Sequence, residues 1–216
     1  MAKLNLALLL IILSTYFSSV LVKASWTKHN PQTMSYIESS CNVTLYQDLC
    51  IRCLAKYVKN YSIIDGPHHL AQVALSVSLS RALHTRGYLS RLAKELKTMK
   101  NKKEYLMVKD CANQITDSVD QLTQAIKELS EFSRYDFTIN DDMLWHISNV
   151  ETWVSTALTD ASTCVDSFTG LRMSKTMTAI KIKAQNMEKV TSNALDLFRV
   201  YTLKSYKATT RTTKKP

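Results

Sequence analysis

The stretch that decides the fold is WVSTALTDASTCVDSF, residues 153–168. Its apolar residues recur at spacings of three and four, which is the period of a helix with one buried face. These residues are Val154, Ala157, Ala161, Val165 and Phe168. The stretch contains no glycine, and Cys164 lies near its end. We therefore interpret it as a helix that a disulfide ties to a neighbouring segment.

The same periodicity marks three further segments of the chain. We predict four helices, from about Pro67 to Leu96, from Asn101 to a loop at 133–140, from Asn140 to Gly170, and from about Ser174 onward. Glycine and proline number only three each, which argues against a strand-rich fold with its many turns. Because short connections force neighbouring helices to run antiparallel, the expected fold is all-α, an antiparallel up-and-down four-helix bundle.

Cys111 and Cys164 lie at nearly equal height in such a bundle. Counting back from Phe132 to Cys111 gives 21 residues, and counting forward from Asp141 to Cys164 gives 23. Both helices rise about 1.5 Å per residue, and a disulfide needs Cα atoms about 5–6 Å apart. We therefore predict that a Cys111–Cys164 disulfide joins the second and third helices.

The other three cysteines precede the bundle, in a segment from Tyr36 to Tyr57 that has the pattern of two short helices. Cys41–Cys50 would clamp these helices into an α-hairpin and leave Cys53 as a free thiol. Cys41–Cys53 is the alternative, because Cys50 and Cys53 are three residues apart and face similar directions on a helix. A free Cys53 would act as a small buried hydrophobic residue.

The N-terminal residues have the pattern of a secretory signal peptide, which we place at residues 1–24. Lys3 precedes an apolar run that is too short to span a bilayer, and Ala24 suits the cleavage site. Secretion predicts disulfides, no membrane contact after cleavage, and two candidate N-glycosylation acceptors, Asn42 and Asn60. The folded domain then spans residues 25–203, and we expect the basic, Thr-rich residues 204–216 to form a disordered tail.

Sequence motifs of catalysis, metal binding and phosphate binding are missing, so we expect neither an enzyme nor a cofactor. The histidines His68, His69 and His84 lack the clustering of a metal site, and Asp141-Asp142 is explained by helix capping. The chain carries a net charge of +10. Because secretion excludes nucleic acid as a partner, this charge favours an acidic wall polysaccharide, contacted mostly by the tail, or serves solubility alone.

Four blocks of sequence resemble the plant invertase and pectin methylesterase inhibitor family. In chain order they are YIESSCNVTLYQDLC, YLMVKDCANQITDSVDQL, VETWVSTALTDASTCVDSF and VTSNALDLF. The resemblance runs from about Tyr36 to Tyr201. It implies a four-helix bundle with an N-terminal α-hairpin, and the disulfides Cys41–Cys50 and Cys111–Cys164. Cys53 departs from the four-cysteine pattern of the family.

The resemblance implies that the chain is an inhibitor that does no chemistry itself. Invertase inhibitors of the family insert a Pro-Lys-Phe segment into their target, and this tripeptide is absent here. We therefore expect a secreted inhibitor of pectin methylesterase that acts in the apoplast or cell wall, as a one-to-one complex over the pectin-binding cleft. An inhibitor of acid invertase is the alternative, and a small-ligand-binding helical bundle is a more remote one.

The resemblance also directs attention to the polar faces of the second and third helices. Asn113, Asp117, Asp120 and Gln124 follow one another at spacings of four, three and four, which places them on one side of the second helix. Family members often carry an acidic residue where Asn113 stands. The comparable patch on the third helix consists of Asp160, Thr163 and Asp166. We expect these seven residues to bind the enzyme; the alternative is that both patches are merely solvated faces.

Overall fold

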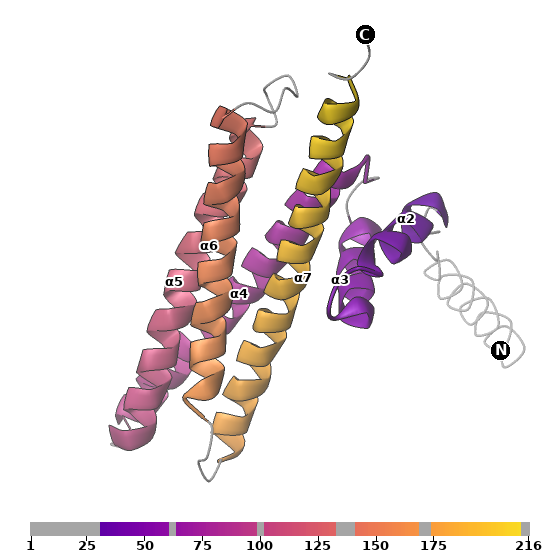
Figure 1. Ribbon diagram of the computed structural model, residues 1–216. Helices are drawn as coiled ribbons and strands as arrows, with labels where there is room; N and C mark the ends of the chain where they lie inside the picture. The colour runs from indigo at the N-terminus through magenta and orange to yellow at the C-terminus, as the bar shows by residue number, and fades with distance from the viewer. Residues whose placement is uncertain (1–30, 61–63, 99–101, 133–140, 169–173, 213–216) are drawn as a thin grey trace, which may run out of the picture. The chain divides into compact units, whose positions relative to one another are not determined.

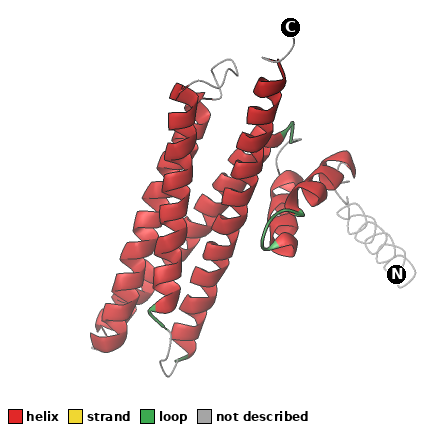
Figure 2. Cartoon of the chain, in the orientation of Figure 1, coloured by secondary structure: helices red, strands yellow, loops and turns green. Residues whose placement is uncertain are grey.

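The computed structural model describes residues 31–60, 64–98, 102–132, 141–168 and 174–212, and this part of the chain is helical, without strands (Figures 1 and 2). Residues 1–30, which contain the predicted signal peptide, lie outside the described residues. The helices are α2 (Pro31–Cys41), α3 (Gln47–Asn60), α4 (Pro67–Thr98), α5 (Lys102–Phe132), α6 (Asp141–Asp166) and α7 (Lys175–Thr212).

The four long helices form an antiparallel bundle. In the order α4, α5, α6, α7, each helix packs against the next, and α7 closes the ring by packing against α4. Figure 1 shows α5 and α6 side by side, with α4 and α7 completing the bundle. The helices α2 and α3 pack against each other as a hairpin, and α3 contacts α4 and α7. The predicted fold class is therefore confirmed.

The described helix starts follow from local chemistry. Pro67 begins α4, where its missing N–H costs no hydrogen bond. Gly66 before it has a φ of 130°, a conformation that favours glycine. Ser174 caps α7, because its hydroxyl accepts a hydrogen bond from the Met177 N–H at 3.2 Å. The helix boundaries predicted at Asn101, Asn140 and Gly170 lie outside the described residues.

Each long helix turns its predicted apolar stripe into the core. On α6, for example, Val154, Ala157 and Ala161 have no exposed surface, and Phe168 just beyond the helix is 1% exposed. Gly87 does not interrupt α4, which continues to Thr98. The other fully buried large side chains belong to α2, α4, α5 and α7: Ile37, Leu75, Leu89, Val108, Ile115, Leu122, Leu129, Ile180, Met187 and Phe198.

The predicted tail boundary at residue 204 is wrong, because α7 continues to Thr212. The Ser205 hydroxyl donates a hydrogen bond to the Tyr201 carbonyl at 3.0 Å, as it does only within a helical turn. No glycine or proline occurs between Ser174 and Pro216, so nothing in the sequence ends the helix earlier. Residues 213–216 lie outside the described residues.

Two disulfides hold the fold. Cys111 and Cys164 join α5 to α6, with their Cα atoms 4.7 Å apart, as the equal-height argument predicts. Of the two pairings that the sequence leaves open for Cys41, the structure contains the one with Cys50, with a Cα separation of 5.8 Å. Cys53 is free and partly buried.

The hairpin is also fixed to α7 by polar contacts. The side-chain amide of Asn193 accepts a hydrogen bond from the Tyr46 N–H at 3.0 Å and donates one to the Tyr46 carbonyl at 2.9 Å. Asp196, one turn along α7, accepts a hydrogen bond from the Leu45 N–H at 3.2 Å. These contacts satisfy backbone groups of the turn between α2 and α3, so they dock that turn on the bundle.

Candidate functional site

The helices of the bundle differ in charge, and α5 and α6 form its acidic side. The segment Asp141–Asp166 contains five acidic residues and no lysine or arginine. The segment Lys102–Phe132 contains six acidic and four basic residues. Because α5 and α6 are neighbours in the ring, their outward carboxylates share one surface. A surface of this kind suits a basic partner.

The four predicted residues of α5 all point to solvent. Asn113, Asp117, Asp120 and Gln124 are exposed, whereas Ile115 and Leu122 of the same helix are fully buried. The span from Asn113 to Gln124 rises by about 16 Å along the helix. This row of residues is therefore continuous, and the apolar stripe of α5 leaves it free for a partner.

Packing fixes the register between α5 and α6. Seven residues along α5 from Cys111, the Ser118 hydroxyl donates a hydrogen bond to the carbonyl of Ala157 at 3.1 Å, and Ala157 lies seven residues before Cys164 on α6. Farther along, His146 Nδ1 lies 2.7 Å from Glu128 Oε1. The two helices thus stay aligned from the disulfide to the Glu128–His146 pair.

This register brings Asp160 of α6 close enough to Asp117 of α5 for the two carboxylates to interact. The pKa of Asp160 is raised, first by partial burial and then by the negative charge of Asp117. Asp160 Oδ2 is buried and, among the described residues, has no hydrogen-bond partner. A carboxylate oxygen in this state would gain from a donor that a partner protein supplies.

The other two predicted residues of α6 lie nearer to the disulfide. Thr163 and Asp166 are exposed, and the Thr163 hydroxyl donates a hydrogen bond to the Thr159 carbonyl at 2.8 Å. The structure therefore brings Asp117 and Asp160 together and distributes the remaining predicted residues along the same helix pair. We call the seven residues the acidic surface: Asn113, Asp117, Asp120, Gln124, Asp160, Thr163 and Asp166.

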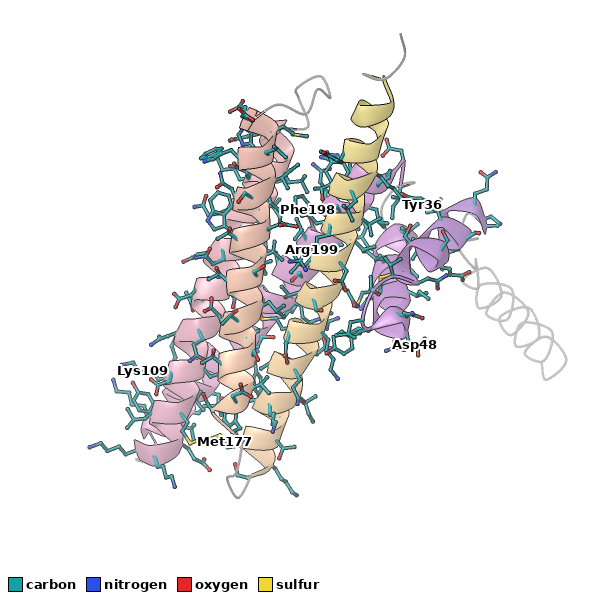
Figure 3. All side chains as sticks on the ribbon, viewed as in Figure 1. Tyr36, Asp48, Lys109, Met177, Phe198 and Arg199 are labelled. Atoms are coloured by element: carbon teal, nitrogen blue, oxygen red, sulfur yellow. A yellow bond between two sulfur atoms is a disulfide. The ribbon has the colours of Figure 1, made fainter. Side chains whose placement is uncertain are left out.

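A polar groove on the other side of α6 is a feature that the sequence does not reveal. It is open, has a volume of about 450 Å³, and is lined by Glu151, Thr152, Ser155, Thr156, Thr159 and Arg199. Arg199 Nε lies 3.3 Å from Glu151 Oε1 and links α7 to α6. Figure 3 shows Arg199 on α7 beside Phe198, which is fully buried. The sequence signal for this groove is the set of Ser and Thr residues on α6, from Thr152 to Thr159, which recur at spacings of three and four.

The apolar cavity beneath the hairpin offers little room for a ligand, whereas the larger depression of about 530 Å³ beside the α2–α3 turn is open and partly polar. A cavity lined by residues of α3, α4 and α7, Cys53 among them, has a volume of about 10 Å³, which is roughly the space of one water molecule. Arg81 Nη2 lies 3.9 Å from Cys53 Sγ. A drug-sized ligand needs a pocket of about 300 Å³ or more, so this apolar cavity does not support the small-ligand alternative.

His68, His69 and His84 each make their own contacts and do not form a cluster. His69 Nδ1 lies 2.7 Å from Asp65 Oδ1, and His84 Nδ1 lies 2.7 Å from the Ser80 carbonyl. His68 is half-buried, and burial lowers its pKa. Within the described ranges, no three His, Cys, Asp or Glu side chains group as a metal site would require, and no helix is long and apolar enough to cross a membrane.

Of the two sequons, Asn42 lies in the turn after α2 and is exposed. The third residue of its sequon, Thr44, is buried, and its hydroxyl donates a hydrogen bond to the Cys41 carbonyl at 2.8 Å. Asn60 is the last residue of α3, and its side chain lies outside the described part.

Comparisons with known proteins agree with this architecture. The family model "Plant invertase/pectin methylesterase inhibitor" matches residues 35–197. The chain is 38% identical to pectinesterase inhibitor 9 of Arabidopsis thaliana over 89% of this chain and 92% of that protein. It is 35% identical to pectinesterase inhibitor 11 of the same plant over 80% and 83%. A crystal structure of a pectin methylesterase inhibitor from Arabidopsis thaliana is similar in fold, with a TM-score of 0.51, 18% identity, and coverage of 76% of this chain and 95% of that one.

Proposed function

Because the chain belongs to the plant invertase/pectin methylesterase inhibitor family, we propose that it is a secreted protein inhibitor of a plant pectin methylesterase. The observation that carries this proposal is the acidic surface on α5 and α6, whose helix pair the Cys111–Cys164 disulfide clamps. The protein acts as a binding partner and performs no reaction on the substrate.

The inhibitor forms a stoichiometric complex that covers the pectin-binding cleft of the enzyme. A rigid helix pair loses little conformational entropy on binding, because its side chains are already positioned. The carboxylates of Asp117, Asp120 and Asp166 attract basic groups beside the cleft, and Asp160 supplies an oxygen that lacks a partner within the described chain. Pectin cannot enter the cleft because the bound inhibitor occupies it.

Two observations favour pectin methylesterase over acid invertase as the target. The relatives compared above are named pectinesterase inhibitors and match most of this chain. The sequence also contains no Pro-Lys-Phe tripeptide, and its only proline within the bundle segments is Pro67 at the start of α4. An inhibitor that blocks its target with a helix face needs no such inserted segment.

Secretion places the protein in the apoplast or cell wall. Residues 1–24 act as the signal peptide, the oxidising route forms the two disulfides, and the exposed Asn42 carries a glycan. The basic C-terminal residues 204–216 contact pectin, whose carboxylates attract them.

The test is inhibition by the purified, disulfide-bonded protein. One plant pectin methylesterase and one acid invertase are assayed with increasing inhibitor, and size-exclusion chromatography with light scattering measures the complex. We expect loss of methylesterase activity with an endpoint near one inhibitor per enzyme, and full invertase activity. Loss of invertase activity alone would identify acid invertase as the target. Full activity of both enzymes at micromolar inhibitor would remove the proposal.

A further inference from the structure

The side of the bundle opposite the acidic surface is basic. The segment Pro67–Thr98 of α4 contains five basic residues and one acidic residue, and Lys175–Thr212 of α7 contains eight basic and two acidic ones. Since α4 and α7 are neighbours in the ring and α5 and α6 are the other neighbouring pair, the bundle separates its charges by side. This separation is not needed for an inhibitor that uses only its acidic side.

Part of this basic side is free of the hairpin. Where α3 packs on α4 and α7, it covers residues such as Ala74, Val77, Val190 and Ala194. Farther along α4 and nearer the start of α7, the basic side chains are exposed. We call four of them the basic face: Arg91, Lys94, Lys175 and Lys183. Within the described part of the chain, none of the four forms an ion pair with an acidic side chain.

Two of these cations have defined positions over one turn of α4. Lys183 Nζ lies 4.8 Å from the centre of the Tyr88 ring, so a cation–π contact positions the ammonium group against α4. The Arg91 guanidinium lies over Gly87, with Nη1 3.8 Å from the point where a side chain would begin. Arg91 and Lys183 thus lie over the same turn of α4, at Gly87 and Tyr88, which point about 100° apart around the helix. Positioned cations without anions of their own are suited to an anionic ligand.

We propose that the basic face binds polyuronate, the carboxylate form of pectin. Disulfides and secretion place the protein outside the cell, which excludes nucleic acid, and a linear polymer with a carboxylate on successive sugars matches cations spread along two helices. The choice of polymer rests on the proposed function. Pectin methylesterase adds water to a methyl ester and yields a carboxylate, methanol and a proton. Each turnover therefore adds one negative charge to the polymer.

The consequence is that the inhibitor is retained where its target has already acted. The acidic surface and the basic face lie on different helix pairs, so enzyme and polymer bind the same molecule without competing for its residues. Polyuronate that accumulates around an active enzyme then raises the local concentration of the inhibitor, which lowers further demethylation.

The test measures retention of the full mature protein on immobilised polygalacturonate and on fully methyl-esterified pectin, at rising salt. The variant Arg91→Glu with Lys183→Glu removes two cations from the basic face. Its matched control is Lys109→Glu with Lys127→Glu, which changes the net charge equally at two exposed positions of α5 (Lys109 is labelled in Figure 3). We expect about tenfold weaker binding of the first variant to polygalacturonate and a change below about twofold for the control.

Circular dichroism and methylesterase inhibition are measured on the same variants. For the Arg91–Lys183 variant, an unchanged spectrum and unchanged inhibition show that only the basic face was altered. Loss of polymer binding can then be told apart from a failure of the inhibition proposal. The milder pair Arg91→Gln with Lys183→Gln should weaken polymer binding less, in the same direction. The proposal is overturned if the two charge-reversal variants lose polygalacturonate binding equally, or if esterified pectin binds as tightly as polygalacturonate. It is also overturned if only Lys214→Glu with Lys215→Glu weakens binding, or if the protein binds anionic phospholipid vesicles but not polygalacturonate.

Discussion

The side chain of Asn193 on α7 pairs with both backbone polar groups of Tyr46, in the turn between α2 and α3. Asn193 is 4% exposed, so its amide is shielded from water. An asparagine is suited to this place because it carries one acceptor and one donor side by side. Because neither described disulfide joins the hairpin to the bundle, these hydrogen bonds help to hold the hairpin in place.

Replacing this amide should therefore loosen the hairpin. Asn193→Ala leaves the Tyr46 N–H without its partner and removes one of the two hydrogen bonds to the Tyr46 carbonyl, which still accepts one from the Cys50 N–H. We expect a loss of about 2 kcal/mol in the free energy of unfolding. Urea denaturation followed by circular dichroism measures it. Asp196→Ala removes one bond to an exposed backbone group and should cost less than about 1 kcal/mol. Equal costs for the two variants would show that burial of the amide does not matter.

The two disulfides should differ in their effect on stability. Cys111–Cys164 closes a sequence separation of 53 residues and Cys41–Cys50 one of 9. In the loop-entropy model, their removal costs about 4 and about 2.5 kcal/mol respectively. Cys111→Ala with Cys164→Ala should thus lower the urea midpoint more than Cys41→Ala with Cys50→Ala. A larger loss for the second pair would mean that the hairpin, rather than the α5–α6 pair, controls unfolding.

The main features of the bundle are predictable from the sequence because they depend on period and length. Apolar residues at spacings of three and four identify the buried face of each long helix, and the equal distances of Cys111 and Cys164 from their loop predict the disulfide. Both arguments use only the geometry of a regular helix.

Features that depend on side-chain placement between distant segments were not predictable. Asn193 and Tyr46 are 147 residues apart, and nothing in either local pattern indicates their contact. Cys50 and Cys53 share one side of α3, so the choice between them for Cys41 depends on the path of the turn. The residues after Leu203 look like a tail by composition, yet they lack a helix-ending residue and continue α7.

The proximity of Asp117 and Asp160 has a measurable consequence for titration. Burial and then the charge of Asp117 raise the pKa of Asp160, so Asp117→Asn should lower that pKa. Titration of the Asp160 carboxyl by NMR checks this shift. Asp166→Asn removes an exposed carboxylate elsewhere on the acidic surface and is the control. The prediction fails if the two variants change the pKa of Asp160 by the same amount.

The raised pKa of Asp160 also predicts how stability changes with pH. The folded state holds the Asp160 proton more tightly than the unfolded state does. The contribution of Asp160 to the free energy of unfolding is therefore fully present below the unfolded pKa and is lost as pH rises through the folded pKa. Asp160→Asn should therefore stabilise the protein at pH 7, by a few tenths of a kcal/mol because solvent screens a partly exposed group. At about pH 3, where the carboxyl is protonated in both states, the gain should vanish.

Removing two carboxylates of the acidic surface should weaken inhibition without changing the fold. Asp117→Ala with Asp120→Ala leaves the buried stripe of α5 intact, so its circular dichroism spectrum should match that of the unaltered protein. Two exposed charge contacts of about 0.5–1 kcal/mol each give a rise of roughly 5- to 30-fold in the inhibition constant for pectin methylesterase. Glu38→Ala with Glu95→Ala removes the same charge from exposed positions of α2 and α4. If that pair weakens inhibition equally, net charge alone governs the complex, and if neither pair does, Asp117 and Asp120 lie outside the enzyme interface.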